Sequence, residues 1–228
     1  MILVSDAHVC GGLGNTETFF EMLNKFESND EDLVFLGDIF DLWIGLPRYE
    51  TDYQRKFAAW CEQQKVRRRI GFVEGNHEFY VVRQHHGSFS WSTTCGHREG
   101  QTLFVHGDLI NRADKNYLRF RTLTKNPLVR TLFRYLPYGP RLAHKIKKDL
   151  KNTNHAFRIS LPEAALCDYA EQMFANGIDR VMVGHFHQAW RYEGTAGQYL
   201  QILPDWYSTG EVCRYDGEQA EILPWKAL

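Results

Sequence analysis

The chain has 228 residues, of which 43% are hydrophobic, and its formal net charge at pH 7 is −1. This length and composition suit one substantial core, so we expect one α/β domain over residues 1–228. No apolar run approaches the ~20 residues that a membrane span needs, which excludes a transmembrane helix.

The N-terminus and the cysteines indicate a cytoplasmic protein. An apolar run that we interpret as a strand begins at Met1 and Ile2, which leaves no room for the basic and apolar regions of a signal peptide. The five cysteines are an odd number and show no metal-binding spacing, so we expect reduced thiols.

Local patterns predict the following elements in chain order. Short apolar runs indicate buried strands at 1–4, 33–36, 70–73, 102–105 and 181–183. Apolar residues at helical spacing indicate helices at 15–26, 51–65, 79–86 and 161–176. After residue 187 we expect antiparallel strands at 188–192, 199–203, 210–215 and 220–223. Mixed strand directions favour a two-sheet sandwich over a doubly wound sheet.

Short polar motifs directly follow the buried strands in the first 187 residues. They are Asp6-Ala7-His8, Gly37-Asp38, Gly75-Asn76-His77-Glu78, His106-Gly107-Asp108, and Gly184-His185 followed by Phe186-His187. One Gly-Asp after a strand is usually only a turn, but these motifs occur together and in order. Because the carboxyl ends of parallel strands meet at one edge of a sheet, the side chains should converge. Oxygen and imidazole donors without cysteine favour manganese, iron or zinc.

These donors predict a site for two divalent metal ions. We assign Asp6, His8 and His187 to one ion, and Asn76, His106 and His185 to the other. Asp38 ends the strand between the outer ligand groups and is the expected bridging ligand. Two ions about 3.5–4 Å apart suit hydrolysis of a phosphate ester or anhydride. We expect Asp38, Asn76 and His77 to be catalytic, with His77 as the general acid.

The motif set resembles the calcineurin-like metallophosphoesterase superfamily. The resemblance extends from residue 5 to residue 187 and includes Gly-Asp-x-x-Asp, from Asp38 to Asp41. It implies a two-sheet sandwich flanked by helices. It also implies seven metal ligands, which are Asp6, His8, Asp38, Asn76, His106, His185 and His187.

A second resemblance is to the UDP-2,3-diacylglucosamine pyrophosphatases of lipid A biosynthesis. Two features carry it: the run Gly37–Gly45, and His106-Gly107-Asp108 followed by Asp114, Tyr117, Phe120 and Arg121. It implies hydrolysis of the pyrophosphate to UMP and 2,3-diacylglucosamine 1-phosphate, usually with manganese. It also implies substrate contacts from a set of residues comprising Asn76, His77, Asp114, Tyr117 and Arg121. The best-known members carry arginine at the position of His77, whereas the superfamily at large has histidine.

A basic segment at about 112–158 separates the fourth and fifth strands. It contains thirteen Lys or Arg residues but only two Asp residues. Helices are expected to begin at Asp114 and Pro127, and a third helix is expected around Leu142, Ile146 and Leu150. Cationic amphipathic helices can cover acyl chains or lie on an anionic membrane surface, so we expect a lid and a location at the inner face of the membrane. Alternatively, the helices pack on the core and their charges are solvated.

The expected partner is therefore an acylated UDP-sugar rather than nucleic acid, with manganese ahead of iron or zinc as the metal. One alternative is a phosphodiesterase that acts on nucleotides or nucleic acid, because a basic segment also suits a polyanion. Another is a scaffold protein that uses the same fold. The complete ligand set counts against the scaffold.

Overall fold

The computed structural model describes residues 1–137, 139, 143 and 161–228. The third helix expected in the basic segment, around Leu142, Ile146 and Leu150, lies outside these residues. Within the described ranges, no helix combines the length and the apolar character needed to cross a bilayer.

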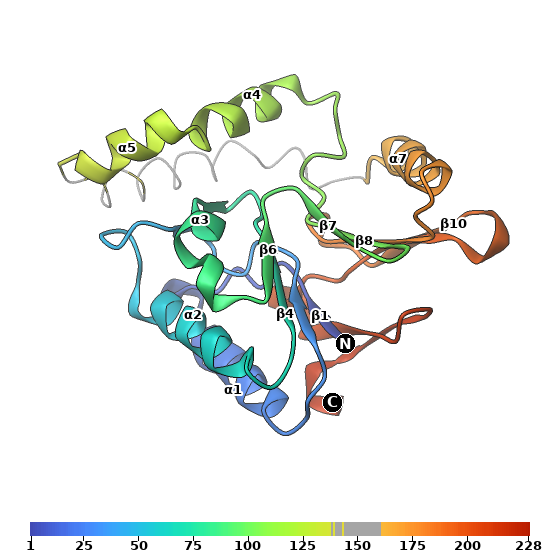
Figure 1. The fold of residues 1–228 in the computed structure, drawn as a ribbon, viewed down its shortest axis with the longest axis horizontal. Helices are drawn as coiled ribbons and strands as arrows, with labels where there is room; N and C mark the ends of the chain where they lie inside the picture. Colours follow the sequence, from blue (N-terminus) through green and yellow to red (C-terminus); the bar gives the residue numbers. More distant parts are fainter. Residues whose placement is uncertain (138, 140–142, 144–160) are drawn as a thin grey trace.

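Two sheets form the centre of the fold (Figure 1). The first contains β1 (Ile2–Val4), β2 (Leu33–Phe35), β4 (Ile70–Val73), β6 (Trp91–Thr93), β12 (Glu211–Tyr215) and β13 (Ala220–Pro224). Its order is β13-β12-β1-β2-β4-β6. The second contains β7 (Gly96–Glu99), β8 (Thr102–Val105), β9 (Arg180–Val183), β10 (Trp190–Glu193) and β11 (Tyr199–Ile202), in the order β10-β11-β9-β8-β7. A separate short pair joins β3 (Trp43–Ile44) to β5 (Glu78–Phe79) in parallel.

Apolar side chains hold the sheets and helices in layers. Leu3 and Val73 from the first sheet pack with Phe104 and Met182 from the second. The other face of the first sheet is covered by α1 (Thr16–Phe26) and α2 (Asp52–Gln64), and that of the second sheet by α7 (Glu163–Ala175). Fully burying one large apolar side chain contributes about 1.5–3 kcal/mol, so these clusters are the main source of stability. The layering confirms the predicted two-sheet sandwich flanked by helices.

The expected helix starts in the basic segment are confirmed. Helix α4 (Lys115–Thr124) begins after Asp114, whose carboxylate accepts a hydrogen bond from the Tyr117 amide at 2.9 Å. Helix α5 (Pro127–Tyr135) has proline in its first turn, where a missing N–H has no cost. The described residues also form the short helices α3 (Val81–His85) and α8 (Trp206–Thr209), and 3₁₀ turns at Gly11–Leu13, His86–Ser88, Thr195–Gly197 and Trp225–Ala227.

Strand β11 pairs differently along its two edges. β11 forms the expected antiparallel hairpin with β10, but its other edge pairs in parallel with β9. A hairpin turn fixes only the local pair, and the sequence pattern does not show which third strand lies alongside. As a result, the carboxyl end of β11 lies at the same edge as the carboxyl end of β9. The short strands β3, β5, β6 and β7 were not predicted, because none of them has three consecutive apolar residues.

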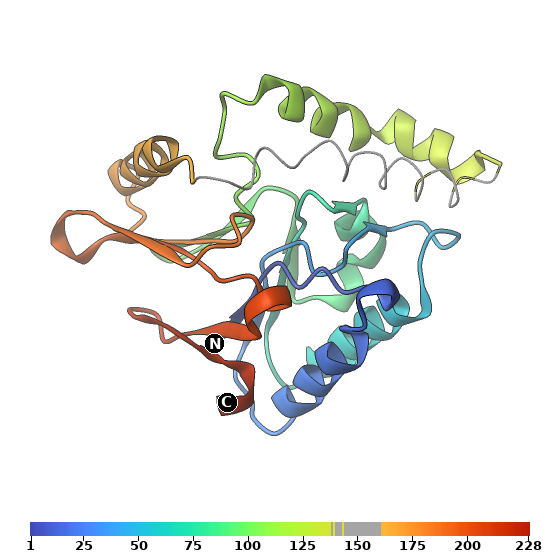
Figure 2. The same cartoon turned by 180° about the vertical axis from the view of Figure 1, so that it is seen from behind.

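Helices α4 and α5 form an arm along one edge of the molecule, on the side of α3 and away from α1 and α2 (Figures 1 and 2). Tyr49 packs on Phe133 of α5 and donates a hydrogen bond to its carbonyl at 2.7 Å. Several large apolar side chains of the arm are exposed: Phe120 (41%), Leu123 (63%), Leu128 (79%), Leu132 (61%) and Tyr135 (72%).

Candidate metal centre

The expected ligands lie at strand ends in an unusual backbone conformation. Asp6, His8, Asp38, His185 and His187 all have positive φ, between 43° and 73°. Each such non-glycine residue costs about 1–3 kcal/mol and persists only where the surroundings enforce it. Hydrogen bonds between the first two ligand loops do so: the Asp6 amide donates to the Gly37 carbonyl at 3.1 Å, and the His8 amide to the Asp38 carbonyl at 3.0 Å. Strain of this kind is typical of functional sites.

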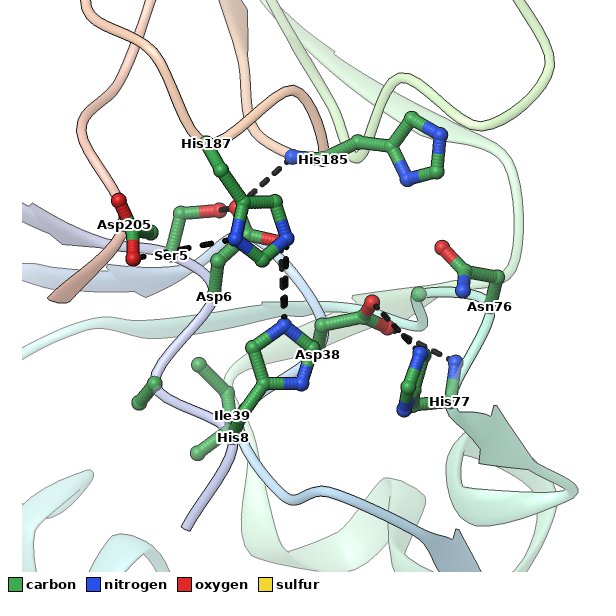
Figure 3. A network of polar contacts seen from close by, with 12 residues as sticks. Ser5, Asp6, His8, Asp38, Ile39, Asn76, His77, His185, His187 and Asp205 are labelled. Atoms are coloured by element: carbon green, nitrogen blue, oxygen red, sulfur yellow. Dashed lines mark hydrogen bonds and ion pairs between the residues drawn. The ribbon is translucent and has the colours of Figure 1, made fainter. Parts of the chain in front are cut away.

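Asp6, His8 and His187, the ligands expected for one ion, lie together and form the first group (Figure 3). The Nε2 atoms of His8 and His187 are 3.3 Å apart. Oδ2 of Asp6 accepts hydrogen bonds from the Ser5 hydroxyl at 2.5 Å and from the His185 amide at 2.7 Å. Its other oxygen, Oδ1, is buried without a hydrogen-bond partner and lies 3.5 Å from Nε2 of His187.

The second group of expected ligands contains Asp38, Asn76, His106 and His185. Nδ1 of His106 donates to the Leu36 carbonyl at 2.8 Å, which directs Nε2 towards Oδ1 of Asn76 at 2.9 Å and Oδ2 of Asp38 at 3.5 Å. The ring of His185 packs against His106 with centroids 5.1 Å apart. These atoms come from loops after β2, β4, β8 and β9, so the sheet edge brings them together.

Charge in the second group is shared unevenly. Burial alone would lower the pKa of His106, but Asp38 outweighs burial and raises that pKa to about 10. Burial lowers the pKa of His185 to about 4, and the neighbouring His106 adds to the shift. The Asp38 carboxylate thus favours a proton on Nε2 of His106, the nitrogen that faces Asn76 and Asp38.

The donor set fits divalent metal ions. Two nitrogens that each lie about 2.1 Å from a tetrahedral ion are about 3.4 Å apart, which is close to the 3.3 Å between His8 and His187. The unpartnered Oδ1 of Asp6 is a buried acceptor that a cation would satisfy. In each of two groups, Asp6-His8-His187 and Asp38-His106-His185, the ligand atoms all lie within 4.8 Å of one another. Asp38 also lies within this distance of His8 and His77, which connects the two groups.

His77 lies beside Asp38 with its ring partly open to solvent. Its amide donates to Oδ1 of Asp38 at 2.8 Å, and its Nδ1 donates to the Asp41 carbonyl at 2.7 Å. Nε2 is thereby left as the free ring nitrogen, 3.8 Å from Oδ2 of Asp38. The side chain is 33% exposed, so a substrate can reach this nitrogen.

Glu78 connects two ligand loops, a role that the sequence motif did not indicate. Its buried carboxylate accepts backbone hydrogen bonds from Asp38 (2.9 Å), Ile39 (2.8 Å) and Gly75 (2.7 Å). Burial raises the pKa of this carboxyl, and the backbone donors oppose that shift because they bond the ionised form. The result is a fixed spacing between the loops of Asp38 and Asn76.

Asp205 is a second residue that sequence reasoning missed. Its Oδ2 lies 3.8 Å from Nδ1 of His187 and accepts hydrogen bonds from the Ser208 amide (3.1 Å) and hydroxyl (2.5 Å). A carboxylate behind a histidine ligand orients the ring and fixes its tautomer. Asp205 reaches this edge because β11 is parallel to β9, a pairing that the sequence pattern does not show.

The residues expected to contact substrate fall into two sets. Asn76 and His77 lie at the sheet edge among the expected metal ligands. Tyr117 and Arg121 lie on α4, where the Tyr117 hydroxyl and Nε of Arg121 (2.7 Å) both donate to Oδ2 of Asp108. Asp114 caps the start of the same helix.

Glycines allow the loops to approach closely. A Cβ atom on Gly75 would lie 2.2 Å from Oδ1 of Asp38, and one on Gly184 would lie 2.1 Å from Oγ of Ser5. A side chain at position 75 would displace the backbone of Asp38, and one at position 184 would displace the Ser5 hydroxyl, which donates to Asp6.

Comparison with known proteins places these motifs in a family. The model for calcineurin-like phosphoesterases matches residues 1–189. A UDP-2,3-diacylglucosamine hydrolase of Shewanella sp. (strain ANA-3) is 28% identical over 239 residues, which cover 99% of this chain and 98% of the relative. The protein of the same name from Xanthomonas campestris pv. campestris is 26% identical, with 95% of each chain covered. A solved phosphoesterase-like protein of Streptococcus pneumoniae TIGR4 is 12% identical with a TM-score of 0.43, over 99% of this chain and 88% of its own.

Proposed function

The chain belongs to the calcineurin-like phosphoesterase family of metal-dependent hydrolases, and on that premise we propose that it hydrolyses UDP-2,3-diacylglucosamine. The products would be UMP and 2,3-diacylglucosamine 1-phosphate. One observation carries this substrate: similarity over 99% of the chain to a relative named UDP-2,3-diacylglucosamine hydrolase.

Two divalent ions would be held by the ligand groups described above, with Asp38 between them. Such ions activate the attacking water and neutralise the charge of the phosphate oxygens. We propose manganese as the native metal, with iron or zinc as alternatives, because imidazole and carboxylate donors accept all three. Asn76 is a neutral ligand, so the pocket carries less negative charge than it would with a carboxylate and repels the pyrophosphate less.

His77 would act at the leaving oxygen. Water attacks the phosphorus of the uridylyl half, the P–O bond of the anhydride breaks, and the departing oxygen belongs to 2,3-diacylglucosamine 1-phosphate. Nδ1 of His77 keeps its proton in the bond to the Asp41 carbonyl, so the general acid would be the doubly protonated imidazolium, which gives the proton on Nε2 to the leaving oxygen and becomes neutral. Nε2 lies 3.8 Å from Oδ2 of Asp38 and therefore next to the expected metal ligands.

The arm formed by α4 and α5 would receive the acylated half. Leu123, Leu128 and Leu132 are 63%, 79% and 61% exposed, respectively, which is a large apolar surface to leave in water. Exposed cationic side chains such as Arg119 and Arg134 accompany these leucines. This combination suits an acyl chain drawn from an anionic membrane, so we propose peripheral contact with the inner face of the membrane.

A substrate panel tests this proposal. Manganese-loaded protein would be given UDP-2,3-diacylglucosamine, UDP-N-acetylglucosamine, a cyclic nucleotide and single-stranded DNA at several salt concentrations. We expect kcat/KM to be highest for the diacylated substrate, with little dependence on salt. A preference for DNA that falls steeply with added salt would instead indicate a polyanion phosphodiesterase.

A further inference from the structure

One face of α4 carries polar side chains at four-residue spacing, which places them in a single stripe. The stripe consists of Tyr117 and Arg121 of α4 and of Lys125, the residue directly after the helix. The side chains of Arg121 and Lys125 are only 14% and 12% exposed, although they belong to a strongly basic segment. This stripe therefore faces the body of the protein, and its charges are not solvated.

The first contact of the stripe is with the loop that carries His106. Nε of Arg121 donates to Oδ2 of Asp108 at 2.7 Å, and the Tyr117 hydroxyl donates to the same oxygen. Nη2 of Arg121 also donates to the Thr94 carbonyl at 2.7 Å. The Asp108 side chain is 4% exposed and lies two positions after His106.

The second contact is with the loop that carries Asn76. Nζ of Lys125 donates to the Gly75 carbonyl at 2.8 Å and lies 2.9 Å from Oε1 of Glu74. The Glu74 side chain is 1% exposed, and Gly75 directly precedes Asn76. The stripe thus holds the two loops whose ligands, His106 and Asn76, face each other at 2.9 Å.

We propose that Arg121 and Lys125 are positioning residues for the metal ion bound by Asn76, His106 and His185. This inference rests on the ligand assignment of the proposed function. Arg121 acts through Asp108 on His106, and Lys125 acts through Gly75 on Asn76. Helix α4 is thereby part of the metal centre as well as the start of the arm.

This role differs from the substrate contact expected of Arg121 from its sequence position. Two of its guanidinium nitrogens are already committed, one to Asp108 and one to Thr94. A substrate contact would appear mainly in KM, whereas a positioning role appears in metal affinity before any substrate is added.

The test is a titration of the purified metal-free protein with manganese. Calorimetry measures the affinity for each ion, and electron paramagnetic resonance monitors the bound ions. Arg121→Gln and Lys125→Gln would be compared with Arg119→Gln, a matched control on the exposed face of the same helix. Changes in such outer contacts typically weaken metal binding by roughly 10–100-fold. We expect that loss for one of the two ions in each stripe variant, unchanged affinity for the ion of Asp6, His8 and His187, and no change in the control.

Paired neutral variants keep the test decisive if a single variant leaves an unpaired buried charge and does not fold. Arg121→Gln with Asp108→Asn, and Lys125→Gln with Glu74→Gln, remove both charges together. Stripe variants that bind both ions as tightly as the wild type would overturn the proposal, and so would an equal loss in Arg119→Gln. A wild-type protein that binds no divalent ion would refute the proposed metal centre itself, which is a separate result.

Discussion

The Nε2 atoms of His8 and His187 lie 3.3 Å apart, although 179 positions separate the two residues in the chain. Only one of the two nitrogens can carry the proton of such a contact. Oδ1 of Asp6, which is buried without a hydrogen-bond partner, lies 3.5 Å from Nε2 of His187 and 4.0 Å from Nε2 of His8. This arrangement suits a cation better than it suits a hydrogen-bonded histidine pair.

Ion stoichiometry tests how the ligands are shared. His8→Ala should leave about one ion per chain, because only the first group loses a donor. Asp38→Ala should weaken both ions, because Asp38 lies between the groups. Elemental analysis after dialysis measures both variants, with the exposed Asp52→Ala as control. Full occupancy of both sites in Asp38→Ala would show that Asp38 does not bridge.

The role of His77 is tested by the leaving group. His77→Ala should retain both ions and lose about 10²-fold or more in kcat, because the proton donor is missing. The loss should grow across a series of UMP esters as the pKa of the leaving alcohol rises. An equal loss for every ester would mean that His77 only supports Asp38 and Asn76.

Gly75→Ala tests the close approach of two ligand loops. The added Cβ would lie 2.2 Å from Oδ1 of Asp38 and 2.6 Å from its backbone nitrogen. Overpacking of this kind costs about 1–3 kcal/mol, so we expect a lower melting temperature and weaker metal binding. Gly87→Ala is the matched control, since nothing lies within 4 Å of its Cβ position. Normal metal binding by Gly75→Ala would show that the loops can separate without consequence.

Stability below pH 6 should depend on Glu50. Its carboxylate accepts hydrogen bonds from Nε1 of Trp43 at 3.1 Å and from Nε2 of His85. Burial acts to raise its pKa, but the bond from His85 outweighs burial and holds the pKa below its usual range. A carboxyl whose pKa is lower in the folded than in the unfolded state stabilises the folded protein at any pH above its unfolded-state pKa, which is about 4.3 for glutamate. That contribution is lost as the pH falls through the pKa of the folded state.

The expected result is a smaller loss of stability on acidification in Glu50→Gln than in the wild type. Urea unfolding midpoints between pH 6 and pH 3 measure it, and Glu62→Gln, on the exposed face of α2, is the control. Parallel pH profiles for the wild type and Glu50→Gln would contradict the prediction.

Local patterns predicted the elements that are long or clearly bounded. Apolar runs located the strands before each ligand motif, and Asp114 and Pro127 correctly marked the starts of α4 and α5. The co-occurrence of motifs at strand ends was sufficient to predict which side chains converge, because parallel strands deliver their carboxyl ends to one edge.

Contacts that depend on non-local pairing could not be predicted. The parallel pairing of β11 with β9 brings Asp205 behind His187, and no hairpin signal contains that information. The contact between Arg121 and Asp108 depends on how α4 packs against the loop that follows β8. The helical spacing of the α4 residues does not determine that packing.

The most direct test of the proposed activity is the release of UMP from UDP-2,3-diacylglucosamine in detergent micelles. Manganese-loaded protein would be compared with the same protein after chelation, and with hydrolysis of bis(4-nitrophenyl) phosphate. We predict metal-dependent UMP release with a kcat/KM far above that for the small diester. Hydrolysis of the small diester without UMP release would contradict the assignment of this lipid precursor as the substrate.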